Sequence, residues 1–132
     1  MSLSMYQASV PVLIHNLKAL AGILKKGADH AKARGIDPAV LVDARLFPDM
    51  FPLARQVQIA TDMAKGGAAR LAGVEIPSFP DTESSFPELQ ERIARTIAFL
   101  KSITPAQLEG SEQRAVNLQM RMGAVSFTGQ YY

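Results

Sequence analysis

The chain has 132 residues, a length that favours a single domain. Its 14 Lys and Arg residues against 12 Asp and Glu leave a net charge of +2, and no block of like charge indicates a nucleic-acid-binding arm. The lack of cysteine excludes disulfides, thiolate catalysis and zinc–thiolate sites. No apolar stretch approaches the ~18 residues of a membrane span, and the N-terminus lacks a signal-peptide pattern. These features predict a cytoplasmic protein with neither nucleic acid nor membrane as a partner.

Residues 4–34 form the first predicted helix. Pro11 either kinks this helix or marks its first turn, and Gly35 stands where a left-handed C-terminal residue belongs. A short helix follows, with Asp37 as its N-cap and Pro38 in its first position. The long helix carries one apolar face at helical spacing. Its members are Val10, Leu13, Ile14, Leu17, Leu20, Ala21, Leu24, Ala28 and Ala31.

The second long helix is predicted over residues 51–72, ending at Gly73. The small residues of its core face favour close approach of a neighbouring backbone. The pair Gly66-Gly67 costs about 1 kcal/mol of helix propensity per glycine, so we expect it to allow close packing, with a local helix break as the alternative. The predicted core face comprises Val57, Ala60, Ala64, Gly67, Ala68 and Leu71.

The third long helix is predicted over residues 86–103. Ser85 and Glu88 have the spacing of a capping box, with Pro87 in the first turn. Acid-before-base pairs, Glu88 with Arg92 and Glu91 with Arg95, are expected on its outer side. Its apolar stripe comprises Leu89, Ile93, Thr96, Ile97, Leu100 and Ile103.

The hydrophobic period then changes from helical to alternating. Residues 116–122 alternate apolar and polar side chains, which predicts a strand. Gly123 provides a turn, residues 125–127 form a second short strand, and Thr128 is a candidate N-cap for one helical turn over residues 129–132. Three amphipathic helices joined by turns indicate an up-down-up arrangement, in which a fourth seat is common.

The histidines do not predict a metal site. His15 and His30 are the only two, and both lie off the apolar stripe of the first predicted helix. At 1.5 Å rise per residue they would be roughly 22 Å apart on a continuous helix, too far to share one ion. No nucleophile elbow and no phosphate-binding loop occurs, so we predict neither a metal nor another cofactor.

One polar patch is a candidate binding site. Arg55, Gln58 and Asp62 share a face of the second predicted helix. They would either recognise a ligand or partner, or form an ordinary solvated face. Asp49 could extend this patch or cap the turn after Pro48.

The runs "DPAVLVDARLFPDMFPLARQVQIATDMAKGGAARLAG", "IPSFPDTESSFPELQERIARTIAFL" and "SFTGQ" closely resemble an uncharacterised bacterial family, a domain of unknown function. The resemblance covers nearly the whole chain, and "ARLFPDMFPLARQVQ" is its most specific part. The family is grouped with the DinB/YfiT-like metalloenzymes. That grouping implies an all-α, up-down-up-down four-helix bundle, here with a short β-hairpin near the C-terminus.

The resemblance does not transfer a metal site. In the DinB/YfiT-like superfamily three histidines typically hold a metal, one from the second long helix and two from the last. Residues 51–72 contain no histidine, and the last helix, which should start at about "GQYY", is missing from this chain. Residues 1–132 are therefore expected to be a single DinB-like domain that is incomplete at its C-terminus.

Two hypotheses of function follow. An uncovered apolar groove marks an interface, so the first is a protein that acts by binding or oligomerisation, as a homodimer or higher homo-oligomer, without its own metal site. The alternative is a metal-dependent enzyme of the thiol-transferase type, whose ligands are lost or supplied by another chain. Val12 and Ile23 form either a second contact surface or scattered exposed apolar residues. A fragment of a longer product is a further possibility.

Overall fold

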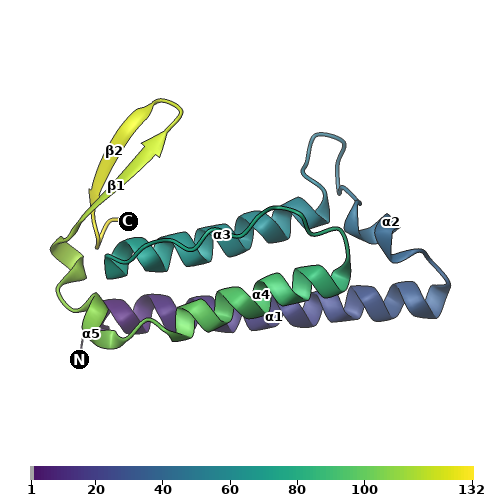
Figure 1. Ribbon diagram of the computed structural model, residues 1–132, viewed down its shortest axis with the longest axis horizontal. Helices are drawn as coiled ribbons and strands as arrows, with labels where there is room; N and C mark the ends of the chain where they lie inside the picture. The colour runs from purple at the N-terminus through teal and green to yellow at the C-terminus, as the bar shows by residue number, and fades with distance from the viewer. Residues whose placement is uncertain (1) are drawn as a thin grey trace.

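The computed structural model describes residues 2–132. Three long helices, α1 (Met5–Arg34), α3 (Leu53–Ala72) and α4 (Phe86–Lys101), form a bundle (Figure 1). The connections contain α2 (Pro38–Val42), α5 (Pro105–Leu108) and a short 3-10 helix, η1 (Ser111–Gln113). Strands β1 (Ala115–Met120) and β2 (Gly123–Thr128) pair as an antiparallel hairpin that projects from one end of the bundle. The predicted helical class with an appended hairpin is confirmed. Among residues 2–132, no helix is long and apolar enough to span a membrane.

The ends of α1 are set by local hydrogen bonds. The hydroxyl of Ser4 accepts from the backbone N–H of Gln7, whose side chain accepts in return from the N–H of Ser4, so two of the unpaired N–H groups at the helix start are satisfied. Gly35 ends the helix in the left-handed conformation, with φ of 65°. Pro11 lies inside α1 and does not mark its first turn.

The directions of the helices differ from the expected up-down-up order. Leu53 at the start of α3 and Phe86 at the start of α4 line one cavity together with Gly27, near the end of α1. Both helices therefore begin at the same end of the bundle and run parallel to each other, antiparallel to α1 (Figure 1). The order is up-down-down.

The cause of this parallel arrangement is the chain between α3 and α4. Residues 74–85, which we call the return segment, are extended and run back along α3 (Figure 1). Phe79 lies against Lys65, and further along Asp81 pairs with Arg55 near the start of α3. This length of chain can reach about 40 Å when extended, whereas the 20 residues of α3 span only about 30 Å. The connection between α3 and α4, whose sequence is that of an ordinary loop, is therefore long enough to return the chain to the end of the bundle at which α3 begins.

The core is centred on α4. Helices α1 and α3 each pack mainly against α4 and make less contact with each other. Consequently, the side of the bundle between α1 and α3 is only partly closed. The buried residues of α1 are spaced by seven, which is two helical turns. They are Val10, Leu17, Leu24 and Ala31.

The glycine pair in α3, Gly66-Gly67, leaves room for nearby side chains and not for a neighbouring helix. The helix is continuous through both glycines, so the alternative of a local break does not occur. A Cβ on Gly66 would lie 3.0 Å from Nη1 of Arg70, and a Cβ on Gly67 would lie 3.9 Å from the hydroxyl of Tyr132. The expected close approach of another backbone is therefore wrong at these two positions.

The C-terminal residues pass tightly beneath the hairpin. Gly129 donates its N–H to the carbonyl of Arg114 at 2.8 Å. A Cβ on Gly129 would lie 1.8 Å from the carbonyl oxygen of Ser111, so only glycine fits there. The N–H groups of Tyr131 and Tyr132 then donate to the carbonyl of Thr128, which forms the single turn that the sequence predicts.

Candidate functional site

A buried arginine joins α4 to α3. Arg92 is fully buried and lies midway along α4. Its Nε donates to Oγ1 of Thr61 at 2.7 Å, and its Nη2 pairs with Oδ1 of Asp62 at 2.7 Å. The Thr61 hydroxyl is itself fixed because it donates to backbone carbonyls one turn earlier in α3. A charged group can be buried here because its donors find partners.

The same arginine holds the return segment. Nη1 of Arg92 donates to Oε1 of Glu83 at 2.7 Å and to the carbonyl of Pro80 at 3.2 Å, and Nη2 pairs with Oδ1 of Asp81 at 3.1 Å. The Glu83 side chain is only 5% exposed. The expected outer pair of Glu88 with Arg92 is wrong, because Arg92 points inward.

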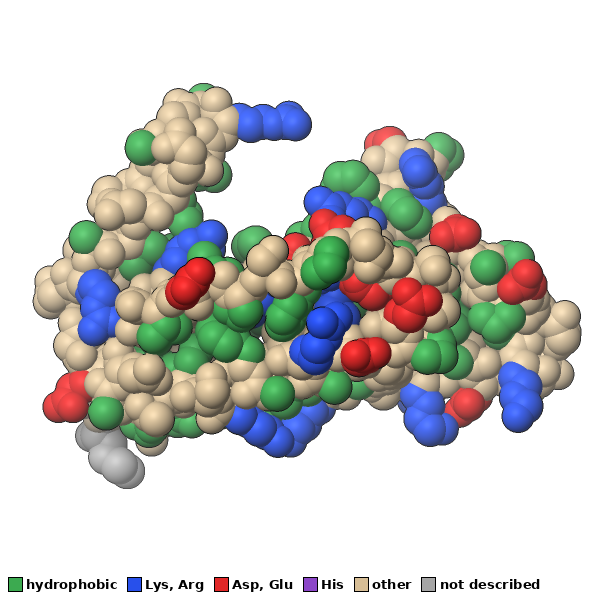
Figure 2. All heavy atoms as spheres, in the orientation of Figure 1, with side chains coloured by type: hydrophobic (Ala, Val, Ile, Leu, Met, Phe, Trp, Pro, Cys, Tyr) green, Lys and Arg blue, Asp and Glu red, His purple; other side chains and the backbone are tan. Residues whose placement is uncertain are grey.

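Two further cations complete this charged cluster. Nζ of Lys65 lies 3.0 Å from Oδ1 of Asp62, and Nη1 of Arg55 lies 2.8 Å from Oδ2 of Asp81. The Lys65 side chain is 4% exposed, and its ammonium lies 4.1 Å from the centre of the Phe79 ring. Figure 2 shows acidic and basic side chains close together in the middle of this face.

The structure keeps only two of the four members of the predicted polar patch together. Arg55 and Asp62 are joined to the charged cluster through Asp81 and Arg92. Gln58 is buried, with 6% exposure. Asp49 lies apart, in an exposed turn between α2 and α3. The return segment thus provides partners for the two charged members of the patch on α3.

A cavity opens beside the charged cluster. It has a volume of about 290 Å³ and lies between the second half of α3 and the return segment. Its lining is polar on the α3 side and contains an aromatic ring on the other. The lining residues are Asp62, Lys65, Gly66, Arg70, Ile76, Pro77, Ser78, Phe79 and Asp81.

A second hollow is an apolar groove between α1 and α3. Its volume is about 380 Å³. Ala60, predicted to be in the core, is exposed here, and Met63 is 72% exposed at its edge. Val12 and Ile23 are exposed on α1 outside this groove. The lining carries no charged side chain and consists of Leu13, Asn16, Leu17, Leu20, Ala60, Met63 and Ala64.

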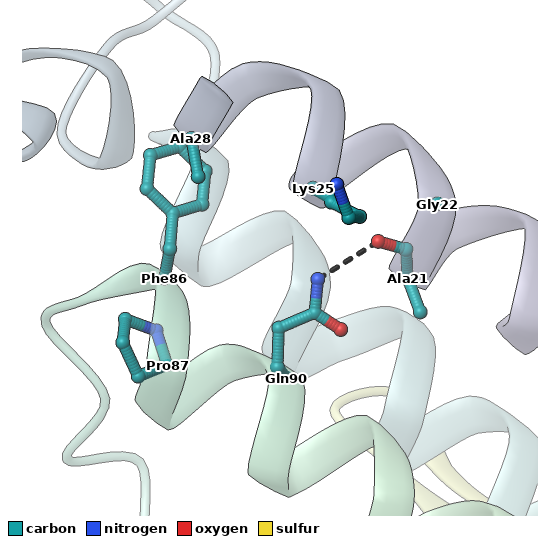
Figure 3. A pocket seen from close by; sticks show the side chains of 7 residues that line it. All are labelled: Ala21, Gly22, Lys25, Ala28, Phe86, Pro87 and Gln90. Carbon is teal, nitrogen blue, oxygen red and sulfur yellow. Dashed lines mark hydrogen bonds between the residues drawn. The ribbon is translucent and has the colours of Figure 1, made fainter. Parts of the chain in front are cut away.

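A third hollow, between α1 and α4, is a packing seam (Figure 3). The Phe86 ring lies beneath Ala28, and the side-chain amide of Gln90 donates to the carbonyl of Ala21 at 2.8 Å. Lys25 lies at its rim, and its hydrogen bond to Asp29 raises the pKa of the Lys25 ammonium. The cavity measures about 520 Å³, and two of its lining residues, Phe86 and Gln90, hold α4 on α1.

The donor groups present do not fit a three-ligand metal centre. His15 and His30 are both exposed on α1. Across residues 2–132, no three His, Cys, Asp or Glu side chains are grouped so that they could hold a metal ion.

Comparisons with known proteins identify the family. The model of a domain of unknown function, DUF1993, matches residues 5–132. The chain belongs to the DUF1993 family. The crystal structure of a DinB family member protein from Shewanella denitrificans is similar, with a TM-score of 0.88 and 34% identity over 96% of this chain and 71% of that chain. The resemblance to the DinB-like superfamily is thereby confirmed. A comparison with curated proteins found no match.

Sequence reasoning missed the centre of the charged cluster. Arg92 is spaced three residues after Leu89 and four before Thr96, which places it at the edge of the apolar stripe of α4. An arginine in that position, together with the acids Asp81 and Glu83 in the preceding connection, was the available signal.

Proposed function

We propose that this DUF1993 protein is a binding module that associates with a second copy of itself through the groove between α1 and α3. The observation that supports this proposal is the shape of the groove. Ala60 and Ala64 form part of its lining, and Met63, on the same helix, projects from its edge with 72% of its surface exposed.

A second copy is the occupant that this shape favours. A two-fold interface presents the same patch on both partners, so the patch must be complementary to itself. A protruding methionine beside a hollow lined mainly by leucine and alanine side chains meets that condition, because each Met63 can enter the groove of the other copy. Methionine is unbranched and adapts its shape to irregular hollows.

The electrostatics of the groove are compatible with self-association. Its lining contains no charged side chain, so two copies can approach without repulsion between like charges. Asn16 is the one polar residue in the lining, and its amide already donates to the carbonyl of Val12 at 2.9 Å. Burial of this surface would leave that N–H satisfied, and the second N–H and the carbonyl oxygen of the amide would take partners from the other copy.

The metal-dependent alternative has no comparable support. A thiol-transferase reaction of that kind would need metal ligands from another chain, because the described residues contain no suitable group of three. Metal analysis of the purified, untagged protein tests it directly. Stoichiometric zinc or nickel would favour the enzyme over the proposed binding module.

Sedimentation velocity over a range of protein concentrations tests the proposed dimer. We expect the unmodified chain to sediment as a dimer and Met63→Lys as a monomer, because the substitution places a charge on the side chain that enters the apolar groove of the other copy. Met122→Lys is the matched control, since Met122 is fully exposed at the hairpin tip; it should remain dimeric. A monomeric parent protein at high concentration, or a Met63→Lys protein that stays dimeric, would refute the proposal.

A further inference from the structure

The cavity between α3 and the return segment is surrounded by more positive than negative charge. The ion pairs and ring contacts around it involve four cationic side chains and three carboxylates, and a fifth cation lines the cavity itself. The cations are Arg55, Lys65, Arg70, Arg92 and Arg95, and the acids are Asp62, Asp81 and Glu83.

The two acids that line the cavity are neutralised by neighbours. Oδ1 of Asp62 lies 2.7 Å from Arg92 and 3.0 Å from Lys65. Asp81 pairs through one oxygen with Arg92 at 3.1 Å and through the other with Arg55 at 2.8 Å. Because Arg92 is shared by both acids and by a third carboxylate, the network holds three cations against three acids, and neither lining acid presents an uncompensated negative charge to the cavity.

Lys65 is a buried cation whose ammonium has more hydrogen-bond donors than acceptors around it. Its side chain is 4% exposed, and its ammonium meets a single carboxylate oxygen, which it shares with Arg92. Its other close contact is the face of the Phe79 ring, at 4.1 Å. An ammonium has three donors, and a buried charge is costly unless it is paired and hydrogen-bonded. An acceptor in the cavity would complete the hydrogen bonding of Lys65.

Arg70 provides the second cationic group of the cavity. Its guanidinium folds back over Gly66, where the missing Cβ leaves room for Nη1, and Nη1 donates to the hydroxyl of Tyr132 at 2.9 Å. That partner is neutral, so the charge of Arg70 is not balanced by it. A guanidinium held in this way presents a planar fork of donors that matches a carboxylate or a phosphate.

We propose that this cavity is a binding site for a small anion that carries a phosphate or carboxylate group. Lys65 and Arg70 donate to the anion, Gly66 leaves the space that positions Arg70, and Asp62 and Asp81 hold the surrounding cations in place. The volume of about 290 Å³ lies just below the usual range for pockets that bind drug-sized ligands, which suits a small anion.

Titration calorimetry of the whole chain at low ionic strength, with inorganic phosphate in one arm and acetate in the other, tests this site. We expect saturable binding of at least one probe. Stronger binding of phosphate identifies a tetrahedral anion as the preferred ligand, and stronger binding of acetate identifies a carboxylate. The absence of saturable binding of either probe overturns the proposal.

Variants separate the site from general attraction of anions to a basic surface. Arg70→Gln removes one donor fork at a partly exposed position and should weaken binding about tenfold or more, since bonds to charged groups are the stronger class. Gly66→Ala keeps every charge but crowds Nη1 of Arg70, and should also weaken binding. Arg34→Gln, in the exposed last turn of α1, is the matched control and should leave binding unchanged. Equal weakening by Arg34→Gln and Arg70→Gln would refute a specific site.

Discussion

Replacement of Arg92 by methionine removes the charge at the centre of the cluster and keeps an unbranched side chain. In the parent protein this guanidinium contacts α3 through Thr61 and Asp62 and the return segment through Glu83. The variant therefore tests whether one buried arginine fastens three parts of the chain together.

The magnitude of the effect follows from what each partner loses. Asp62 and Asp81 are about 40% exposed and keep Lys65 and Arg55 as partners, so water and these cations compensate them. Glu83 is 5% exposed and loses the only ion-pair partner that it has among residues 2–132. Removal of one partner from a buried pair costs about 3–5 kcal/mol. For a domain of this size that corresponds to a fall in melting temperature of roughly 10–18 °C.

Urea denaturation followed by circular dichroism measures this loss, and limited proteolysis within residues 74–85 measures release of the return segment. Arg95→Met is the matched control, because Arg95 is exposed and lies 4.8 Å from the Phe79 ring; its cost should stay below about 1 kcal/mol. Adding Glu83→Gln to Arg92→Met should restore part of the stability, since it removes the unpaired buried charge. An Arg92→Met protein within about 1 kcal/mol of the parent, with an unchanged rate of cleavage in residues 74–85, would show that the cluster does not fasten the segment.

Two other positions give sharp tests of the packing and capping. Gly129→Ala should lower the free energy of unfolding by about 1–3 kcal/mol, because a Cβ would lie 1.8 Å from the carbonyl oxygen of Ser111. Gly22→Ala is its control: no atom lies within 4 Å of the added Cβ, so the helix should gain up to about 1 kcal/mol. Ser85→Ala should cost about 1 kcal/mol, since the Ser85 hydroxyl accepts from the N–H of Glu88. Denaturation midpoints measure all three, and a neutral Gly129→Ala would mean that η1 can move aside.

The elements that sequence patterns identified correctly are those determined by local chemistry. Gly35 and Gly73 end their helices with φ of 65° and 70°, because left-handed backbone is open to glycine. Asp37 caps α2, and alternation of apolar residues located β1. Each of these signals depends on residues within one or two turns of chain, so a single sequence is enough to read it.

The features that the sequence did not reveal depend on contacts between distant segments. The inward turn of Arg92 is decided by Glu83 and by Thr61, which is 31 residues away in sequence. Considered within α4 alone, Arg92 stands four residues after Glu88, a spacing typical of a surface pair. Only the placement of the return segment shows which acid is the partner.

The charged cluster and the parallel order of α3 and α4 both depend on the extended return segment. A short turn after α3 would have made α4 antiparallel to it. No extended segment would then lie across the two helices. The extended return segment instead brings the backbone carbonyl of Pro80 to the surface of α3 and α4, where an unpaired polar group would be costly. Arg92 provides a donor to that carbonyl and a countercharge for Glu83. The anion cavity lies beside this segment, with Phe79 and Ser78 in its lining, so the reversal of the chain that defines the fold also forms one wall of the proposed site.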